Sequence, residues 1–226
     1  MKSRKRLWIF LPAVFCSLVH AGEFRALSQA CEEALALSAM PEALRQNANV
    51  YVWQDADFKK TVSSDGGFHC LVERNHNKAI IPQCVSPSGK DSILQGLMFR
   101  TKQAAKGLPP NKMQEKLKAA FASGKLIAPK EPGINYMMSA YNYIYVQNSD
   151  SFRQVPPHNM FFAPNTTNEM IGGSWELATG NKGYPFVIES GPHGYMITFT
   201  EQAAEIHGVV EHCEGEIDYE PVNAGS

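Results

Sequence analysis

Two stretches, Pro157-His158-Asn159-Met160-Phe161-Phe162 and Pro192-His193-Gly194-Tyr195-Met196-Ile197-Thr198-Phe199, share one layout: a proline, a histidine and then a largely apolar run. The residue before a proline is pushed towards extended backbone, and runs rich in Phe, Tyr and Ile favour strands. We therefore predict that His158 and His193 each stand at the entrance of a β-strand, where a polar side chain can face a cleft.

The sequence contains further strand-like runs. Residues 68–74 and 79–85 form a predicted hairpin, because the polar turn Asn75-His76-Asn77-Lys78 separates them. The other predicted strands are residues 49–53, 58–62, 134–138, 143–146, 159–163, 186–189 and 193–199. The polar, glycine-rich residues 164–182 are predicted to form a long loop.

Helical spacing of apolar residues predicts an N-terminal helix within residues 23–46 and two central helices at 92–106 and 112–123. Gly107 and Gly124 end the central pair, and Asn111 is the predicted N-cap of its second member. Helices scattered unevenly among hairpins favour an α+β fold: a single domain, mainly antiparallel sheet, with an N-terminal helix and a central helical pair. The predicted boundaries are 1–21 for a signal peptide, 22–200 for the domain and 201–226 for a polar acidic tail.

The first 21 residues have the layout of a secretory signal peptide. Basic residues precede an apolar run at 7–19, and Ala21 supplies the small residue before a cleavage site. The run is shorter than the roughly 20 residues that a membrane-spanning helix needs. We expect an exported protein, periplasmic or secreted, with no membrane span after cleavage.

Charge is balanced, with 21 basic and 22 acidic residues. Without a basic cluster the chain lacks the electrostatic footprint of a nucleic-acid-binding protein. A small molecule or a cell-envelope component is the more reasonable partner. The sequence also contains no Gly-x-Ser-x-Gly elbow, no phosphate loop and no dinucleotide fingerprint.

Four cysteines, Cys31, Cys70, Cys84 and Cys213, remain after cleavage, and four cysteines allow three disulfide pairings. A Cys70–Cys84 bridge would staple the predicted hairpin and leave Cys31 to pair with Cys213. Two alternatives are a zinc site, which the spacing disfavours, and a catalytic thiol at Cys70, which a strand position disfavours.

Among the histidines, His158 and His193 have matching contexts and are the candidate catalytic or metal-binding pair. If their strands are neighbours, the two imidazoles could meet at one end of the sheet, with Tyr195 on the same face as His193 and His69 as a third metal-binding candidate. Glu189 is the nearest carboxylate that could orient an imidazole. The alternative is that each histidine is a half-buried strand-end residue bonded to backbone carbonyls.

The order of four short blocks resembles a group of exported bacterial proteins without an assigned activity. The blocks are Gly67-Phe68-His69-Cys70-Leu71, Pro82-Gln83-Cys84, Pro157-His158-Asn159-Met160-Phe161 and Gly191-Pro192-His193-Gly194-Tyr195. The resemblance covers residues 48–199 and implies a single secreted domain. It assigns no reaction and no cofactor, and Cys213 lies outside it.

Two hypotheses follow. The first is an exported domain that binds a small ligand or an envelope partner at the end holding His158 and His193. The second is a metal-assisted or acid-base hydrolase that uses His158, His193 and Tyr195.

Overall fold

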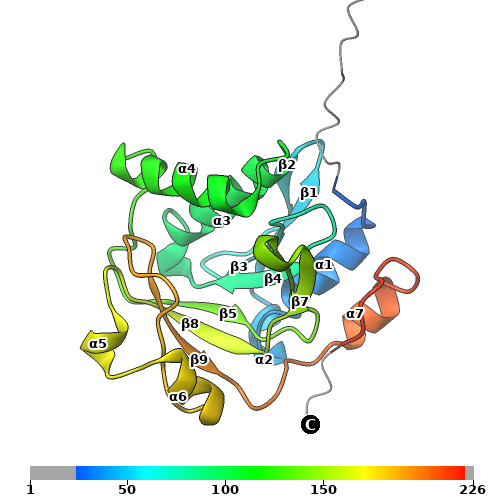
Figure 1. Ribbon diagram of the computed structural model, residues 1–226. Helices are drawn as coiled ribbons and strands as arrows, with labels where there is room; N and C mark the ends of the chain where they lie inside the picture. The colour runs from blue at the N-terminus through cyan, green and yellow to red at the C-terminus, as the bar shows by residue number, and fades with distance from the viewer. Residues whose placement is uncertain (1–23, 222–226) are drawn as a thin grey trace, which may run out of the picture.

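The computed structural model describes residues 24–221, in which a seven-stranded sheet is covered by helices (Figure 1). In sheet order its strands are β2 (Asp57–Val62), β1 (Asn49–Gln54), β3 (His69–Glu73), β4 (Ile81–Val85), β5 (Ile134–Met137), β8 (His158–Phe162) and β9 (Tyr195–Phe199). All neighbouring strands are antiparallel except β1 and β3. The predicted α+β class with a mainly antiparallel sheet is confirmed.

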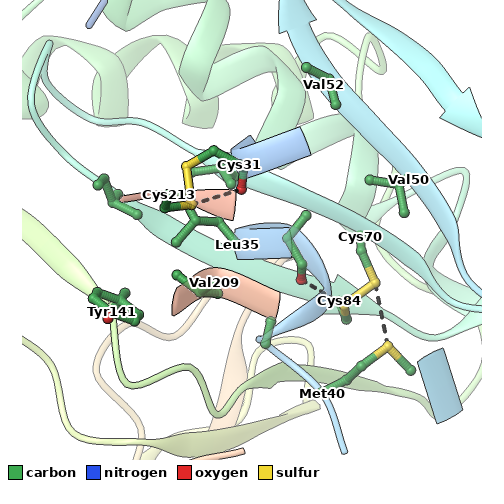
Figure 2. Close-up of a cluster of buried hydrophobic side chains, with 14 of the residues drawn as sticks. Cys31, Leu35, Met40, Val50, Val52, Cys70, Cys84, Tyr141, Val209 and Cys213 are labelled. Atoms are coloured by element: carbon green, nitrogen blue, oxygen red, sulfur yellow. Dashed lines mark hydrogen bonds between the residues drawn. A yellow bond between two sulfur atoms is a disulfide. The ribbon is translucent and has the colours of Figure 1, made fainter. Parts of the chain in front are cut away.

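One face of the sheet packs on helix α1 (Gln29–Leu37) and helix α7 (His207–His212). Ser28 caps α1 by accepting a hydrogen bond from the backbone of Cys31 at 3.2 Å. Alternate residues of the strands, among them Val50, Val52 and Cys84, point into this core with Leu35 and Val209 (Figure 2). The N-terminal helix is thus fixed by apolar burial against the centre of the sheet.

Two disulfides cross this core, and they are the two pairs expected from the sequence. Cys31–Cys213 joins α1 to the residue that follows α7, and Cys70–Cys84 joins directly opposite positions of β3 and β4. A disulfide at Cys70 leaves no thiol there, so the catalytic-thiol alternative is wrong. The chain beyond Thr200 includes α7 and closes onto the domain, because the Arg45 guanidinium donates to the backbone carbonyl of Glu205 at 2.5 Å.

The other face packs on helix α3 (Ile93–Ala104), and helix α4 (Pro110–Ala122) packs on α3 in turn. Leu71 and Val85 of the sheet contact Ile93, Leu94 and Leu97 of α3. Helix α4 begins before the predicted cap at Asn111, because Pro110 occupies the first helical position, where a missing backbone N–H costs nothing.

Shorter elements are α2 (Glu42–Arg45) and the 3-10 turns η1 (Pro87–Gly89) and η2 (Gln147–Ser149).

Three local predictions differ from the structure. Strand β6 (Tyr143–Val146) was expected, but it pairs with an unexpected strand, β7 (Ser151–Gln154), in a separate two-stranded sheet. Residues 186–189 make only one β-bridge, between Phe186 and Ile197. The predicted loop at 164–182 contains two short helices, α5 (Asn168–Ile171) and α6 (Trp175–Gly180), capped by Thr167 and Ser174.

The predicted signal peptide at residues 1–21 lies outside the described residues, as does the end of the predicted tail. Within residues 24–221, every helix is too short or too polar to cross a membrane.

Candidate functional site

The sheet face below α3 and α4 carries an unusual number of polar side chains. Residues directly opposite on paired strands point to the same face, and so do residues two positions apart. The register pairs Met137 with His158, Met160 with Ile197, and Phe162 with Tyr195. His158 and Tyr195 therefore project from the same face of the sheet as Met160.

A cavity of about 330 Å³ lies over this face, between the sheet, α3, α4 and the segment that leads into β9. Its apolar lining consists of Ile81, Pro110, Met113, Met137, Ile144, Val155, Met160, Ile188 and Ile197. Its polar lining consists of Glu73, Asn75, Gln83, Arg100, Gln114, Glu189, His158, His193 and Tyr195. A concave apolar surface with a few convergent polar groups is the usual form of a small-molecule site.

His158 is held as a neutral imidazole at one end of the cavity. Its Nδ1 lies 2.7 Å from the carbonyl oxygen of Pro156, and because a carbonyl only accepts, Nδ1 carries the hydrogen and donates. Burial lowers the pKa of His158 below its ordinary value, so the ring stays uncharged at neutral pH. Its Nε2 is consequently the unprotonated nitrogen, able to accept a hydrogen bond or a proton.

His193 and Tyr195 line the other end. The His193 ring stacks on Phe121 of α4, with ring centroids 4.9 Å apart and planes inclined by 7°. Burial lowers the pKa of His193, with Arg100 as a second cause, and burial raises the pKa of Tyr195, which stays a neutral phenol. The buried Nδ1 of His193 has no hydrogen-bond partner among the described residues.

A polar network that the sequence analysis did not identify joins the helix to the sheet at this end. Arg100 of α3 approaches Glu73 of β3 at two points, Nε to Oε1 at 2.6 Å and Nη2 to Oε2 at 2.8 Å. Gln83 Nε2 donates to Glu73, and Asn135 Nδ2 donates to Gln83 Oε1 at 2.5 Å. One signal was present: Arg100 follows Leu97 by three positions and Ile93 by seven, so it lies on the apolar face of its helix.

Glu189, the predicted imidazole-orienting carboxylate, connects the segment before β9 to α4. It accepts a hydrogen bond from Gln114 and pairs with Lys118, whose Nζ lies 3.3 Å from Oε1. Its negative charge acts on His193 by raising the pKa against the effect of burial. Its direct partners are therefore residues of α4. Glu189 links α4 to the segment before β9 instead of orienting an imidazole through a hydrogen bond.

The two candidate histidines share the cavity but do not meet. Their strands are neighbours, yet β8 and β9 are antiparallel, so the two strand entrances lie at opposite ends. His158 pairs with Phe199 and Phe162 pairs with Tyr195, a separation of four residues, or about 13 Å at about 3.3 Å per residue. The antiparallel register therefore does not bring the two strand entrances to one end of the sheet, where the two imidazoles could have met.

His69 is also separate from this site. It lies on β3, which β4 and β5 separate from β8, so the strand spacing places it about 14 Å from the line of β8. Its Nδ1 forms a hydrogen bond of 3.0 Å with the Tyr51 hydroxyl, and burial lowers its pKa. Across residues 24–221, no three His, Cys, Asp or Glu side chains are grouped so that they can hold a metal ion.

Comparison with protein-family models, with curated proteins and with solved structures found no match.

Proposed function

We propose that this protein is an exported small-molecule-binding protein and that its ligand occupies the cavity over the sheet. The observation that carries the proposal is the distribution of groups in that cavity. A neutral imidazole lies at one end, a network of hydrogen-bonding groups lies at the other, and methionine and isoleucine side chains line the space between them.

The cost of this arrangement supports a functional role. Burying polar groups and an ion pair against a sheet is no more stabilising than filling the same volume with apolar side chains. Glu73 and Gln83 are both buried in the cavity lining, and Asn135 is buried behind them as a partner of Gln83. A bound molecule that uses these groups explains why they are concentrated over one cavity.

Three of the four blocks that resemble exported bacterial proteins contribute to the lining. They supply Gln83, then His158 with Met160, then His193 with Tyr195. The proposal therefore extends to that group: a shared exported binding domain, with a cell-envelope component as the alternative occupant. Export is supported by the signal-like pattern at residues 1–21 and by two disulfides, which persist in oxidising compartments.

A fluorescent probe tests the proposal directly. N-phenyl-1-naphthylamine is neutral, largely apolar and bright only in apolar surroundings, so its emission should rise and saturate at one probe per chain. Met160→Trp fills the middle of the cavity and should abolish this signal. Met170→Trp is the matched control, because Met170 is 71% exposed and is not part of the cavity lining. Equal probe binding by both variants would refute the proposal.

General-base hydrolysis is a second candidate, favoured by the fixed tautomer of His158. His158 lines the cavity, and an unprotonated Nε2 can take a proton from water as the water attacks an ester carbonyl. The test is turnover of p-nitrophenyl octanoate, which should be lost in His158→Gln and kept in His207→Gln, whose imidazole is 94% exposed. Turnover that survives in His158→Gln excludes this histidine as the base.

A further inference from the structure

We infer that the ligand of this cavity is uncharged, with a hydrogen-bonding head group at the end formed by Arg100 and Tyr195 and an apolar body along Met137 and Met160. The inference rests on the proposed function, because it specifies which molecules the cavity accepts. It follows from the charges that line the cavity, each of which already has a partner of opposite sign.

The central charges belong to Arg100 and Glu73, and they pair with each other, although Arg100 Nε makes no aligned hydrogen bond. The guanidinium meets both carboxylate oxygens, at 2.6 and 2.8 Å, and Gln83 adds a third contact to the same carboxylate. An anionic ligand at Arg100 would compete with Glu73 and leave that buried carboxylate without compensation. A cationic ligand at Glu73 would displace Arg100 in the same way, and an unpaired buried charge is strongly unfavourable.

The remaining charges leave no binding site for an ion. Glu189 is balanced by Lys118, which approaches it from α4 at 3.3 Å. The amino end of α4 also contributes to the lining, but Pro110 has no N–H and the backbone N–H of Asn111 donates to Gln147 Oε1 at 3.2 Å. Neither a carboxylate nor an ammonium group would find an unpaired counter-charge.

Neutral hydrogen-bonding capacity does remain at this end. The buried Nδ1 of His193, a residue of the cavity lining, has no partner among the described residues. Tyr195 also lines the cavity, and its hydroxyl is a neutral donor and acceptor. An amide or hydroxyl head group can use such donors and acceptors without disturbing an ion pair. Methionine side chains along the body of the cavity adapt readily to a flexible chain.

Three ligands that differ only in their head group test the inference. Octanamide, octanoate and octylamine carry the same carbon chain with a neutral, a negative and a positive head at pH 7. Displacement of N-phenyl-1-naphthylamine should give octanamide the lowest dissociation constant, by about tenfold or more over each ion, because the ions must leave water without gaining a counter-charge. Preference for either ion, equal displacement by all three, or displacement by none would overturn the inference. The proposed function would still stand in those cases if the probe binds wild type and Met170→Trp but not Met160→Trp, so the two failures are distinguishable.

Variants that change the charges of the cavity test the same inference by altering the protein instead of the ligand. Glu73→Gln leaves the Arg100 charge uncompensated, so octanoate should overtake octanamide. Arg100→Gln leaves Glu73 uncompensated, so octylamine should gain instead. The double variant Glu73→Gln/Arg100→Gln removes both charges and should restore the preference for octanamide. The double variant can also be measured if a single variant does not fold. An unchanged order of ligand preference in every variant that folds would contradict the role given to the Arg100–Glu73 pair.

Discussion

Removing each disulfide in turn should destabilise the protein to different degrees, and the difference follows from chain entropy. The bridges Cys31–Cys213 and Cys70–Cys84 close loops with sequence separations of 182 and 14 residues. In the loop-closure relation these lengths restrict the unfolded chain by about 5 and about 3 kcal/mol. Replacing Cys31 and Cys213 by alanine should therefore lower the free energy of unfolding by about 2 kcal/mol more than replacing the other pair.

The two double variants are well matched in the folded state. All four cysteines are buried, with exposures from 0% to 6%, so each double substitution removes the same atoms from comparable surroundings. The measurement is urea-induced unfolding under non-reducing conditions, extrapolated linearly to water. A larger loss from Cys70→Ala/Cys84→Ala would refute the entropic reasoning. It would mean that native contacts of that pair, such as Cys70 with Met40, outweigh loop length.

The same variants also probe the proposed site. Both bridges lie in the core on the α1 side of the sheet, whereas the cavity lies on the α3 side. Folded protein lacking either bridge should therefore bind N-phenyl-1-naphthylamine with a dissociation constant within about twofold of wild type, since distant sites act nearly independently. A large loss of affinity would show that the two faces of the sheet are coupled.

Further predictions concern single positions. The Glu32–Arg74 ion pair has side chains 2% and 1% exposed, so Glu32→Gln should cost about 3–5 kcal/mol in urea unfolding. Lys112→Ala, which breaks an exposed pair with Glu115, should cost less than about 1 kcal/mol, and similar losses would contradict the burial argument. Burial lowers the pKa of His158, so below about pH 6.5 the unfolded chain takes up a proton that the folded chain resists, and stability falls as the pH drops. The melting temperature should fall less between pH 7 and pH 5 in His158→Gln than in wild type, and a slope that does not change would exclude His158 as a contributor. Gly67→Ala should unfold the protein, because its new Cβ would lie 1.3 Å from the carbonyl oxygen of Asn47. Gly96→Ala, within α3 and with open space around its Cβ, should raise stability by up to about 1 kcal/mol, which the same urea unfolding would show.

Short sequence patterns predicted much of the fold, because these parts of the structure depend on interactions between residues that are close in the sequence. The hairpin of β3 and β4, its disulfide and the two central helices follow from alternation, cysteine number and helical spacing over short stretches. The parallel pairing of β1 with β3 has no such local signal, since it depends on distant parts of the chain. Helices α5 and α6 could have been found, because Thr167 and Ser174 are each followed by an acidic first turn, the usual mark of a helix start.

The candidate site was predicted only in part for a related reason. His158, His193 and Tyr195 could be selected by their sequence context, but their separation depends on strand direction, which a shared motif does not encode. Arg100 and Glu73 lie on different elements, 27 residues apart, and only tertiary packing makes them partners. A charged residue on the apolar face of a predicted helix was the one available signal.

The proposed function assigns stability to one face of the sheet and binding to the other. On the α1 side the strands present valines and a bridged cysteine pair to an apolar core, which two covalent links reinforce. On the α3 side the same strands present Glu73, Gln83 and Asn135, which contribute little net stability even when they are fully paired. In the proposed function, the second face keeps polar groups in place over a cavity, and these groups would recognise a small neutral molecule.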